Sequence, residues 1–171
     1  MDRGVILVDE HGQTNVAGVW AAGDCTGRIM LAHTAYREAE VAVNNILGKR
    51  DVMRFNAVPS VIYTNPEVAS AGMTEEQAKA AGIDYVCKKL SMRYSGRFVA
   101  ENEGGDGICK ILVDKKLNKV IGIHMIGNSS SEIIWGAAAL IETELRVEDI
   151  KELIFPHPTV SEIIRETIFE F

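Results

Sequence analysis

The 171-residue sequence predicts an α+β fold, in which an antiparallel sheet with flanking helices follows a smaller strand–helix unit. Two extended apolar runs flank the short turn at 115–119, as is typical of an antiparallel hairpin. Residues 74–77 and 129–132 have the Ser/Thr-x-x-Glu/Gln spacing of capping boxes, and each predicts the start of a helix. A polar, interrupted segment separates these elements from the first part of the chain. We therefore expect two domains, residues 1–52 and 53–171.

The first part of the chain predicts a hairpin, then a strand, an acidic turn and a helix. Extended runs at 5–8 and 16–22 are joined by turn residues, and the second run stops at Gly23-Asp24. A helix is then predicted by apolar residues at helical spacing, with Gly48 where a helix-ending glycine belongs. These apolar residues are Ala32, Ala35, Ala39, Ala42 and Ile46. Because most of them are alanine, the helix can approach a neighbour closely.

So few elements cannot bury both faces of an α/β layer. We therefore expect the first part to be the end of a larger domain, and the chain to be a fragment of a longer protein.

The second part predicts strands and helices that together make a domain of ordinary size. Strands are predicted at 60–64, 85–94, 107–114 and 120–126. Helices are predicted from the first capping box to Gly82, from the second through Ile141, and at 147–154 and 159–169.

The composition excludes several classes of protein. Apolar residues make up 47% of the chain, as in a folded domain, and the net charge of −6 with no basic stripe argues against nucleic-acid binding. No apolar run approaches the roughly 20 residues of a membrane span. Cys25, Cys87 and Cys109 have neither C-x-x-C nor metal-ligand spacing, so we expect reduced thiols, no metal site and a cytoplasmic protein.

The most informative motif runs from His157 to Glu162. His157 lies between two prolines, which restrict the backbone of the turn, and a histidine near a carboxylate can act as an acid/base group. Two other interpretations stay open. His157 can be an ordinary loop residue, and Thr159-x-x-Glu162 is itself a capping box, so Glu162 can serve the helix instead of the histidine.

Two further positions stand out. Asp24 follows the carboxyl end of a predicted strand, where α/β sheets bind ligands, although an ordinary turn or N-cap aspartate fits equally. Trp135 precedes a run of small residues, which indicates core or dimer-interface packing rather than a cofactor stack.

Six blocks of the chain, taken in order, resemble the C-terminal third of the flavin-dependent pyridine nucleotide–disulfide oxidoreductases. The blocks are residues 14–24, 30–33, 59–69, 72–76, 122–127 (with 131–132) and 157–162. The resemblance is strongest to the branch of the family that acts on dihydrolipoamide. The family's G-x-G-x-x-G fingerprints and its C-x-x-x-x-C redox pair do not occur in this sequence.

The resemblance implies a remnant of the FAD-binding domain followed by the domain through which the family forms homodimers. It implies that His157 takes a proton from a substrate thiol bound at the other subunit, and that Glu162 orients its ring. It also implies that Asp24 contacts the flavin. A second flavin contact, made largely by backbone, is implied for Met30, Leu31, Ala32 and His33.

The implied reaction passes electrons from dihydrolipoamide through a protein disulfide and FAD to NAD⁺. Its partners are the lipoyl groups of 2-oxo acid dehydrogenase or glycine cleavage complexes. FAD and NAD belong to the full-length parent, and we expect this chain alone to bind neither and to be inactive. Two alternatives remain: a non-catalytic dimerisation or scaffold module, and the same region of a glutathione-reductase-like enzyme. Relatives tend to have cis bonds at Asn65-Pro66 and His157-Pro158, so we expect both to be cis.

Overall fold

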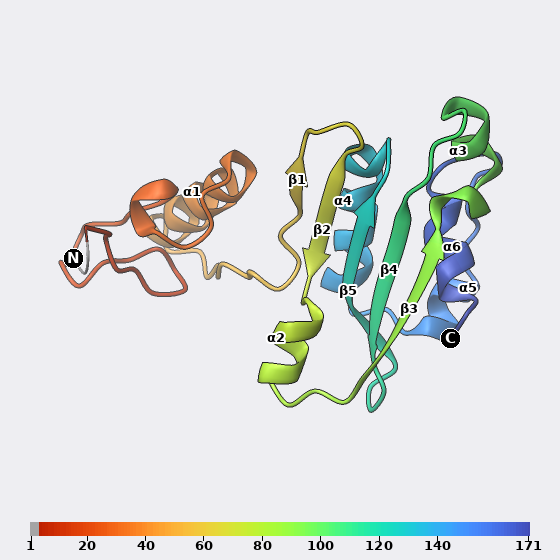
Figure 1. The fold of residues 1–171 in the computed structure, drawn as a ribbon. Helices are drawn as coiled ribbons and strands as arrows, with labels where there is room; N and C mark the ends of the chain where they lie inside the picture. The colour runs from red at the N-terminus through yellow and green to blue at the C-terminus, as the bar shows by residue number, and fades with distance from the viewer. Residues whose placement is uncertain (1–3) are drawn as a thin grey trace. The chain divides into compact units, whose positions relative to one another are not determined.

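The computed structural model describes residues 4–171, which form two compact units divided between Phe55 and Asn56 (Figure 1). Unit 1 ends at Phe55 and unit 2 covers Asn56–Phe171. The sequence placed this division at 52/53, in the same polar connection.

The predicted helix of unit 1 is present as α1 (Ala32–Ile46), and Gly48 follows it with a φ of +76°. Two alanines of the predicted stripe face glycines. A Cβ placed on Gly23 would lie 3.2 Å from that of Ala35, and one on Gly12 would lie 3.4 Å from that of Ala42. The helix therefore packs closely against the turn that precedes it, although Ala32, Ala39 and Ile46 are exposed.

The two strands predicted for unit 1 do not form. Residues 5–8 and 16–22 are irregular, and pairing there is limited to isolated bridges such as that between Gln13 and Trp20. The Ile6 N–H donates to the Cys25 carbonyl at 2.8 Å rather than to a neighbouring strand. The apolar pattern was sufficient for extended backbone, but a strand also needs a continuous ladder of partners, and in the described part of unit 1 pairing is isolated.

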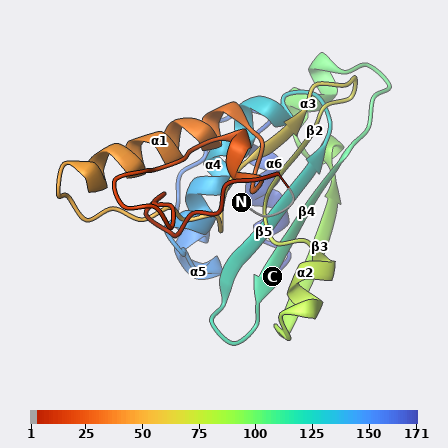
Figure 2. The same ribbon diagram turned by 90° about the vertical axis from the view of Figure 1, so that its left-hand side faces the viewer.

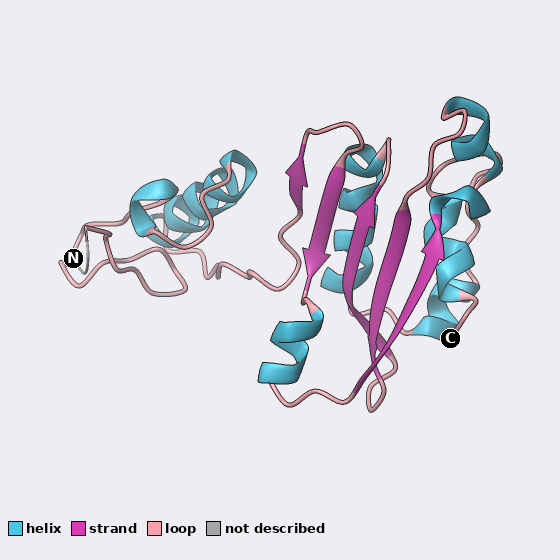
Figure 3. Ribbon diagram, in the orientation of Figure 1, coloured by secondary structure: helices cyan, strands magenta, loops and turns pink. Residues whose placement is uncertain are grey.

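Unit 2 contains the predicted antiparallel sheet. Its strands are β1 (Ser60–Ile62), β2 (Val68–Gly72), β3 (Tyr85–Ser91), β4 (Ile108–Asp114) and β5 (Lys119–Ile126), and Figure 3 shows them side by side. The order in space is β1-β2-β5-β4-β3, with every pair antiparallel, and β4–β5 is the predicted hairpin. The sequence missed β2, because Ala69, Ser70 and Ala71 are small residues with weak strand preference.

Helices cover one face of this sheet. α4 (Ser130–Glu142) packs on β2 and β5, while α6 (Glu162–Ile168) packs on β3 and β4, and Figure 2 shows the helices on one side of the strands. The remaining helical segments are α2 (Glu75–Ala80), η2 (Met92–Tyr94), α3 (Gly96–Glu101) and α5 (Val147–Lys151). α3 was not predicted, and α5 and α6 are shorter than the sequence indicated. Within residues 4–171 no helix combines the length and apolar character of a membrane span.

Of the two capping boxes predicted for α2 and α4, only the first forms. At α2 the Thr74 hydroxyl accepts from the Gln77 N–H, and the Gln77 side chain accepts from the Thr74 N–H. At α4 the N-cap Ser129 has a left-handed backbone (φ +70°), unlike the extended backbone usual at an N-cap, and its side chain makes no capping hydrogen bond. Glu67, from the segment before β2, accepts from the Ser131 N–H instead at 2.8 Å.

We predict that Gly122→Ala destabilises unit 2. A Cβ at this buried position of β5 would overlap the Met73 carbonyl oxygen, which already accepts a hydrogen bond from the sheet. The free energy of unfolding should fall by about 1–3 kcal/mol, as for other overpacked sites. Gly96→Ala is the control, because nothing lies within 4 Å of its added Cβ, and it should change stability by less than about 0.5 kcal/mol. Urea unfolding of both variants checks this, and equal effects would contradict it.

Candidate active site

The His157–Glu162 motif lies in the connection between α5 and α6. Ile150 and Ile163, on the two flanking helices, are almost completely buried, so both ends of the connection are fixed in the core. The His157-Pro158 bond is cis, and so is Asn65-Pro66, as predicted for both.

The sequence left open whether Glu162 bonds to His157 or to the start of the last helix, and in the structure it does both. Its Oε1 lies 2.8 Å from His157 Nδ1, and its Oε2 accepts from the Thr159 N–H at 2.8 Å. The expected capping box is only half formed, since the Thr159 hydroxyl bonds to the Pro156 carbonyl and the Ser161 hydroxyl. One carboxylate therefore fixes the histidine ring and the start of the last helix together.

The electrostatics of the pair favour an ionised carboxylate. The Thr159 N–H, and next the contact with His157, lower the pKa of Glu162 below its ordinary range. The Glu162 side chain is only 17% exposed, whereas that of His157 is 79% exposed. With Nδ1 donating to the carboxylate, Nε2 is left as the ring's proton acceptor, and it makes no hydrogen bond within the described residues. The arrangement can exchange a proton with a group that approaches from outside.

The candidate cofactor residues all lie in unit 1. Asp24 is exposed in the short helix η1 (Asp24–Thr26), immediately after Gly23. The Gly23 N–H donates to the buried carboxylate of Glu38 at 2.5 Å. The sequence analysis missed Glu38, although a carboxylate spaced between Thr34 and Val41 on the buried face of α1 was a usable signal. Glu38 fixes the turn that presents Asp24.

The segment from Met30 to His33 leads into the first turn of α1. Met30 is 64% exposed, and Leu31 is an N-cap without a side-chain capping bond. In the same turn the Thr34 hydroxyl is buried and has no hydrogen-bond partner within the described residues. The structure thus groups Met30–His33 with Asp24 in unit 1, and His157 with Glu162 in unit 2.

The three cysteines do not form a redox pair. Each is a free thiol: Cys25 is exposed, Cys87 is half-buried and Cys109 is buried. Burial raises the pKa of Cys109 to about 12 and also raises that of Cys87. Neither of these two thiols is therefore poised as a thiolate nucleophile.

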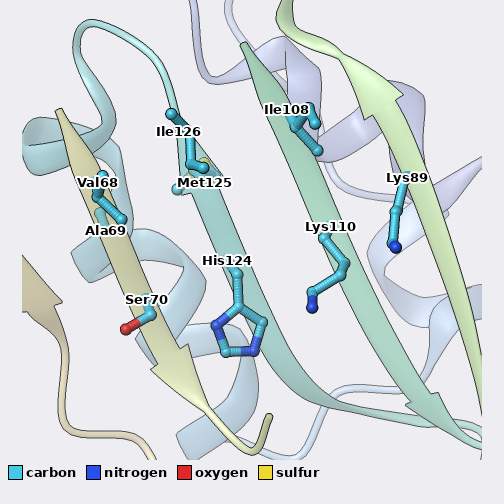
Figure 4. A pocket seen from close by; sticks show the side chains of 9 residues that line it. All are labelled: Val68, Ala69, Ser70, Lys89, Ile108, Lys110, His124, Met125 and Ile126. Carbon is cyan, nitrogen blue, oxygen red and sulfur yellow. The ribbon is translucent and has the colours of Figure 1, made fainter. Parts of the chain in front are cut away.

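A groove of about 310 Å³ lies on the face of the sheet that the helices leave open (Figure 4). Ser70, His124, Lys110 and Lys89 form one row across four strands. His124 Nε2 bonds to the Met73 carbonyl at 2.9 Å, and Lys110 Nζ pairs with Glu75 at 3.3 Å. These contacts attach α2, and Met73 just ahead of its N-cap, to the sheet, so we assign His124 and Lys110 a structural role.

Comparison with family models identifies both units. Residues 58–168 match the model described as pyridine nucleotide-disulphide oxidoreductase, dimerisation domain. Residues 1–39 match the model of the pyridine nucleotide-disulphide oxidoreductases. The chain therefore belongs to the pyridine nucleotide-disulphide oxidoreductase family, and the resemblance described above is confirmed.

Among curated relatives, the chain is similar to dihydrolipoyl dehydrogenases. It is 40% identical to that of Rhizobium etli over 99% of this chain and 35% of the relative. It is 39% identical to the mitochondrial enzyme of Pisum sativum over 95% of this chain and 32% of the relative. The chain thus spans about a third of the length of these relatives.

Solved structures of the family have the same fold. LpdA of Mycobacterium tuberculosis matches with a TM-score of 0.88 and 26% identity, over 97% of this chain and 36% of that structure. RclA of Escherichia coli, an HOCl-induced flavoprotein disulfide reductase, matches with a TM-score of 0.87 and 26% identity, over 99% of this chain and 39% of that structure. The predicted α+β class and antiparallel sheet are confirmed.

The contacts of Glu162 predict a pH dependence of stability. Because its pKa is lowered in the folded chain, the carboxylate stabilises the fold above the unfolded-state value, about 4.3, and this contribution is lost as the pH falls through the lower folded-state value. The free energy of unfolding of the unmodified chain should therefore fall more steeply below about pH 4.5 than that of Glu162→Gln. Urea unfolding at a series of pH values measures both, and parallel profiles would refute the assignment.

Proposed function

We propose that this chain is the C-terminal part of a dihydrolipoyl dehydrogenase and supplies its acid/base dyad and dimer interface. The observation that carries the proposal is the 2.8 Å contact between His157 Nδ1 and Glu162, in a histidine whose side chain is largely exposed. The similarity to dihydrolipoyl dehydrogenases over nearly the whole chain supports the choice of reaction. The full reaction converts dihydrolipoamide and NAD⁺ to lipoamide, NADH and a proton.

In this proposal His157 is the base for the thiol half of the reaction. Nε2 takes the proton from a thiol of dihydrolipoamide, and the resulting thiolate attacks one sulfur of a protein disulfide, displacing the other as a thiolate. A mixed disulfide forms while the protein disulfide breaks. Glu162 keeps Nδ1 as the donor and stabilises the imidazolium that carries the proton. The second substrate thiol then closes the lipoamide ring and leaves the protein pair reduced.

The flavin supplies hydride transfer between the reduced protein thiols and NAD⁺ when it is bound. The residues of unit 1 fit such a group. The first turn of α1 lacks a side-chain cap, so its backbone N–H groups can donate to an electron-rich oxygen at the positive end of the helix. The buried Thr34 hydroxyl needs a partner, and the exposed Asp24 carboxylate can accept from hydroxyl groups. We assign Asp24 and Met30–His33 to flavin contact on these grounds.

A dimer follows from the same proposal. This sequence holds no C-x-x-x-x-C pair, so the disulfide on which His157 acts belongs to other parts of the complete protein, and we place it in the second subunit. We expect the chain alone to bind neither FAD nor NAD and to be inactive. The partners of the complete enzyme would be the lipoyl groups of 2-oxo acid dehydrogenase or glycine cleavage complexes in the cytoplasm.

An apolar groove on unit 2 is the surface we assign to the second copy. Trp135 on α4 is 70% exposed, and Ile154, just after α5, is 98% exposed. A groove of about 360 Å³ lies among them. Its other apolar residues include Ile133, Leu140, Leu153, Phe155 and Ile164. Exposed apolar area of this kind marks an interaction surface.

The likeness to RclA favours a second candidate, a related enzyme that acts on a different disulfide. The same dyad would serve that reaction. Assays of the complete protein with dihydrolipoamide and NAD⁺, and with glutathione disulfide and a reduced nicotinamide nucleotide, separate the two.

We predict that His157→Gln in the complete protein lowers kcat for dihydrolipoamide oxidation by about 10²–10⁴-fold, the usual contribution of a general base. Reduction of the flavin by NADH, which involves no substrate thiol, should be unaffected. His11→Gln is the matched control, since His11 bonds to the Asp51 carbonyl in unit 1 and has no part in the proposed chemistry. A His157→Gln enzyme within about twofold of the unmodified kcat would rule out the assigned role.

We also predict that the double variant Trp135→Asp/Ile154→Asp is monomeric, because two carboxylates would be buried in the apolar groove. Leu117→Asp is the control, being an equally apolar residue, 51% exposed, in the β4–β5 turn. Sedimentation equilibrium of the 171-residue chain should show a dimer for the unmodified chain and the control. A double variant that stays dimeric would place the interface elsewhere.

A further inference from the structure

Ser95 connects the His157 loop to a segment far away in the sequence. Its hydroxyl donates to the Thr159 carbonyl at 2.9 Å, across 64 residues of chain. The same oxygen accepts from the Phe98 N–H at 3.2 Å and so caps α3. Ser95 is 1% exposed, and no pattern in the sequence drew attention to it.

We propose that Ser95 is a positioning residue for His157, acting through Thr159 and Glu162. Any effect of Ser95 on catalysis rests on the proposed function. Its effect on the geometry of the His157 loop does not. Ser95 would touch neither substrate nor cofactor.

The segment that holds Ser95 is rigidly placed. Met92 and Phe98, on either side of it, are 0% and 1% exposed, and the Met92 N–H donates to the Gly107 carbonyl at 2.9 Å. The Ser95 N–H donates to the Met92 carbonyl, and the Ser95 carbonyl accepts from Val99. Each polar group of Ser95 is thus paired, and its hydroxyl has one direction in which to donate.

Thr159 passes this constraint to the dyad. Its carbonyl accepts from Ser95 at 2.9 Å and from the Glu162 N–H at 3.4 Å. Its N–H donates to Glu162 Oε2, and its hydroxyl bonds to Pro156 and Ser161. Because the Thr159 N–H and His157 share one carboxylate, a shift of the Thr159 backbone moves Glu162 and with it the acceptor of His157 Nδ1. Loss of the Ser95 hydroxyl would leave the Thr159 carbonyl with only the longer, 3.4 Å bond from the Glu162 N–H, and so loosen the Thr159 backbone.

The competing explanation is that Ser95 serves only as the N-cap of α3. Val99→Gly separates the two roles. Val99 is 40% exposed in the middle of α3, so glycine there weakens the helix by about 1 kcal/mol, and it keeps the backbone N–H that bonds to the Ser95 carbonyl and leaves the Ser95 hydroxyl unchanged. Ser95→Thr keeps a hydroxyl and should restore the contact. Ser95→Cys, with a similar shape and a much weaker donor, replaces Ser95→Ala if the alanine variant does not fold.

Nuclear magnetic resonance of the 171-residue chain tests the proposal. The ring ¹⁵N shifts of His157 report which nitrogen holds the proton in the neutral ring, and the side-chain carboxyl ¹³C shift of Glu162 reports its titration. In Ser95→Ala we expect loss of the Nδ1–H preference and a Glu162 midpoint that moves up toward that of an ordinary glutamate. Ser95→Thr should behave like the unmodified chain, and Val99→Gly should leave both signals in place.

Unchanged signals in Ser95→Ala, or equal changes in Val99→Gly, would overturn the proposal. In the complete protein Ser95→Ala should lower kcat for dihydrolipoamide oxidation about tenfold with KM unchanged, the effect of a misplaced base. If His157→Gln proves fully active while the resonance changes in Ser95→Ala occur as expected, the proposed function fails and the positioning contact stands.

Discussion

Burial of a single face of the antiparallel sheet is the constraint on which unit 2 depends. Ala69, Ile111 and Ile123 point from neighbouring strands toward α4 and α6 and are almost inaccessible. The side chains that alternate with them along the strands, such as those of Lys110 and His124, lie on the open face of the sheet. α5 and α6 also bury residues in that core, Ile150 and Ile163, so the connection between these two helices begins and ends at fixed points. The precision of the His157 loop therefore derives from apolar packing at its two ends, and polar contacts decide only the last details.

Strongly patterned segments were predictable from the sequence, and the exceptions share a physical cause. The β4–β5 hairpin and the start of α2 depend on residues close to one another in the chain, and both formed as predicted. β2 was missed because its Ala-Ser-Ala core follows from the close approach of α4, which a single strand does not reveal. Ser129 failed as a cap because Glu67, far away in sequence, satisfies the helix start. Tertiary partners replaced the local ones that the patterns assumed.

The candidate site shows the same division. The sequence predicted that His157 and Glu162 could meet, yet it left the carboxylate's role open, because Glu162 is spaced three residues from Thr159, as in a capping box, and five from His157, as a dyad allows. The structure has both, since a carboxylate has two oxygens and the loop offers each one donor. Ser95 could not be found in this way, because it acts on a backbone group that becomes its neighbour only when the chain folds. Glu38 also acts on such a group, and its place on the buried face of α1 was the one signal for it.

The shared carboxylate has a consequence for how this protein can change in evolution. Aspartate, one methylene shorter, could reach the ring or the backbone amide from position 162, but it could not span both. An inserted or deleted residue between Pro158 and Ser161 would likewise break one contact in order to keep the other. Length and side chain are therefore coupled in this loop, and a lineage that altered either would have to rebuild the connection between α5 and α6 in a single step.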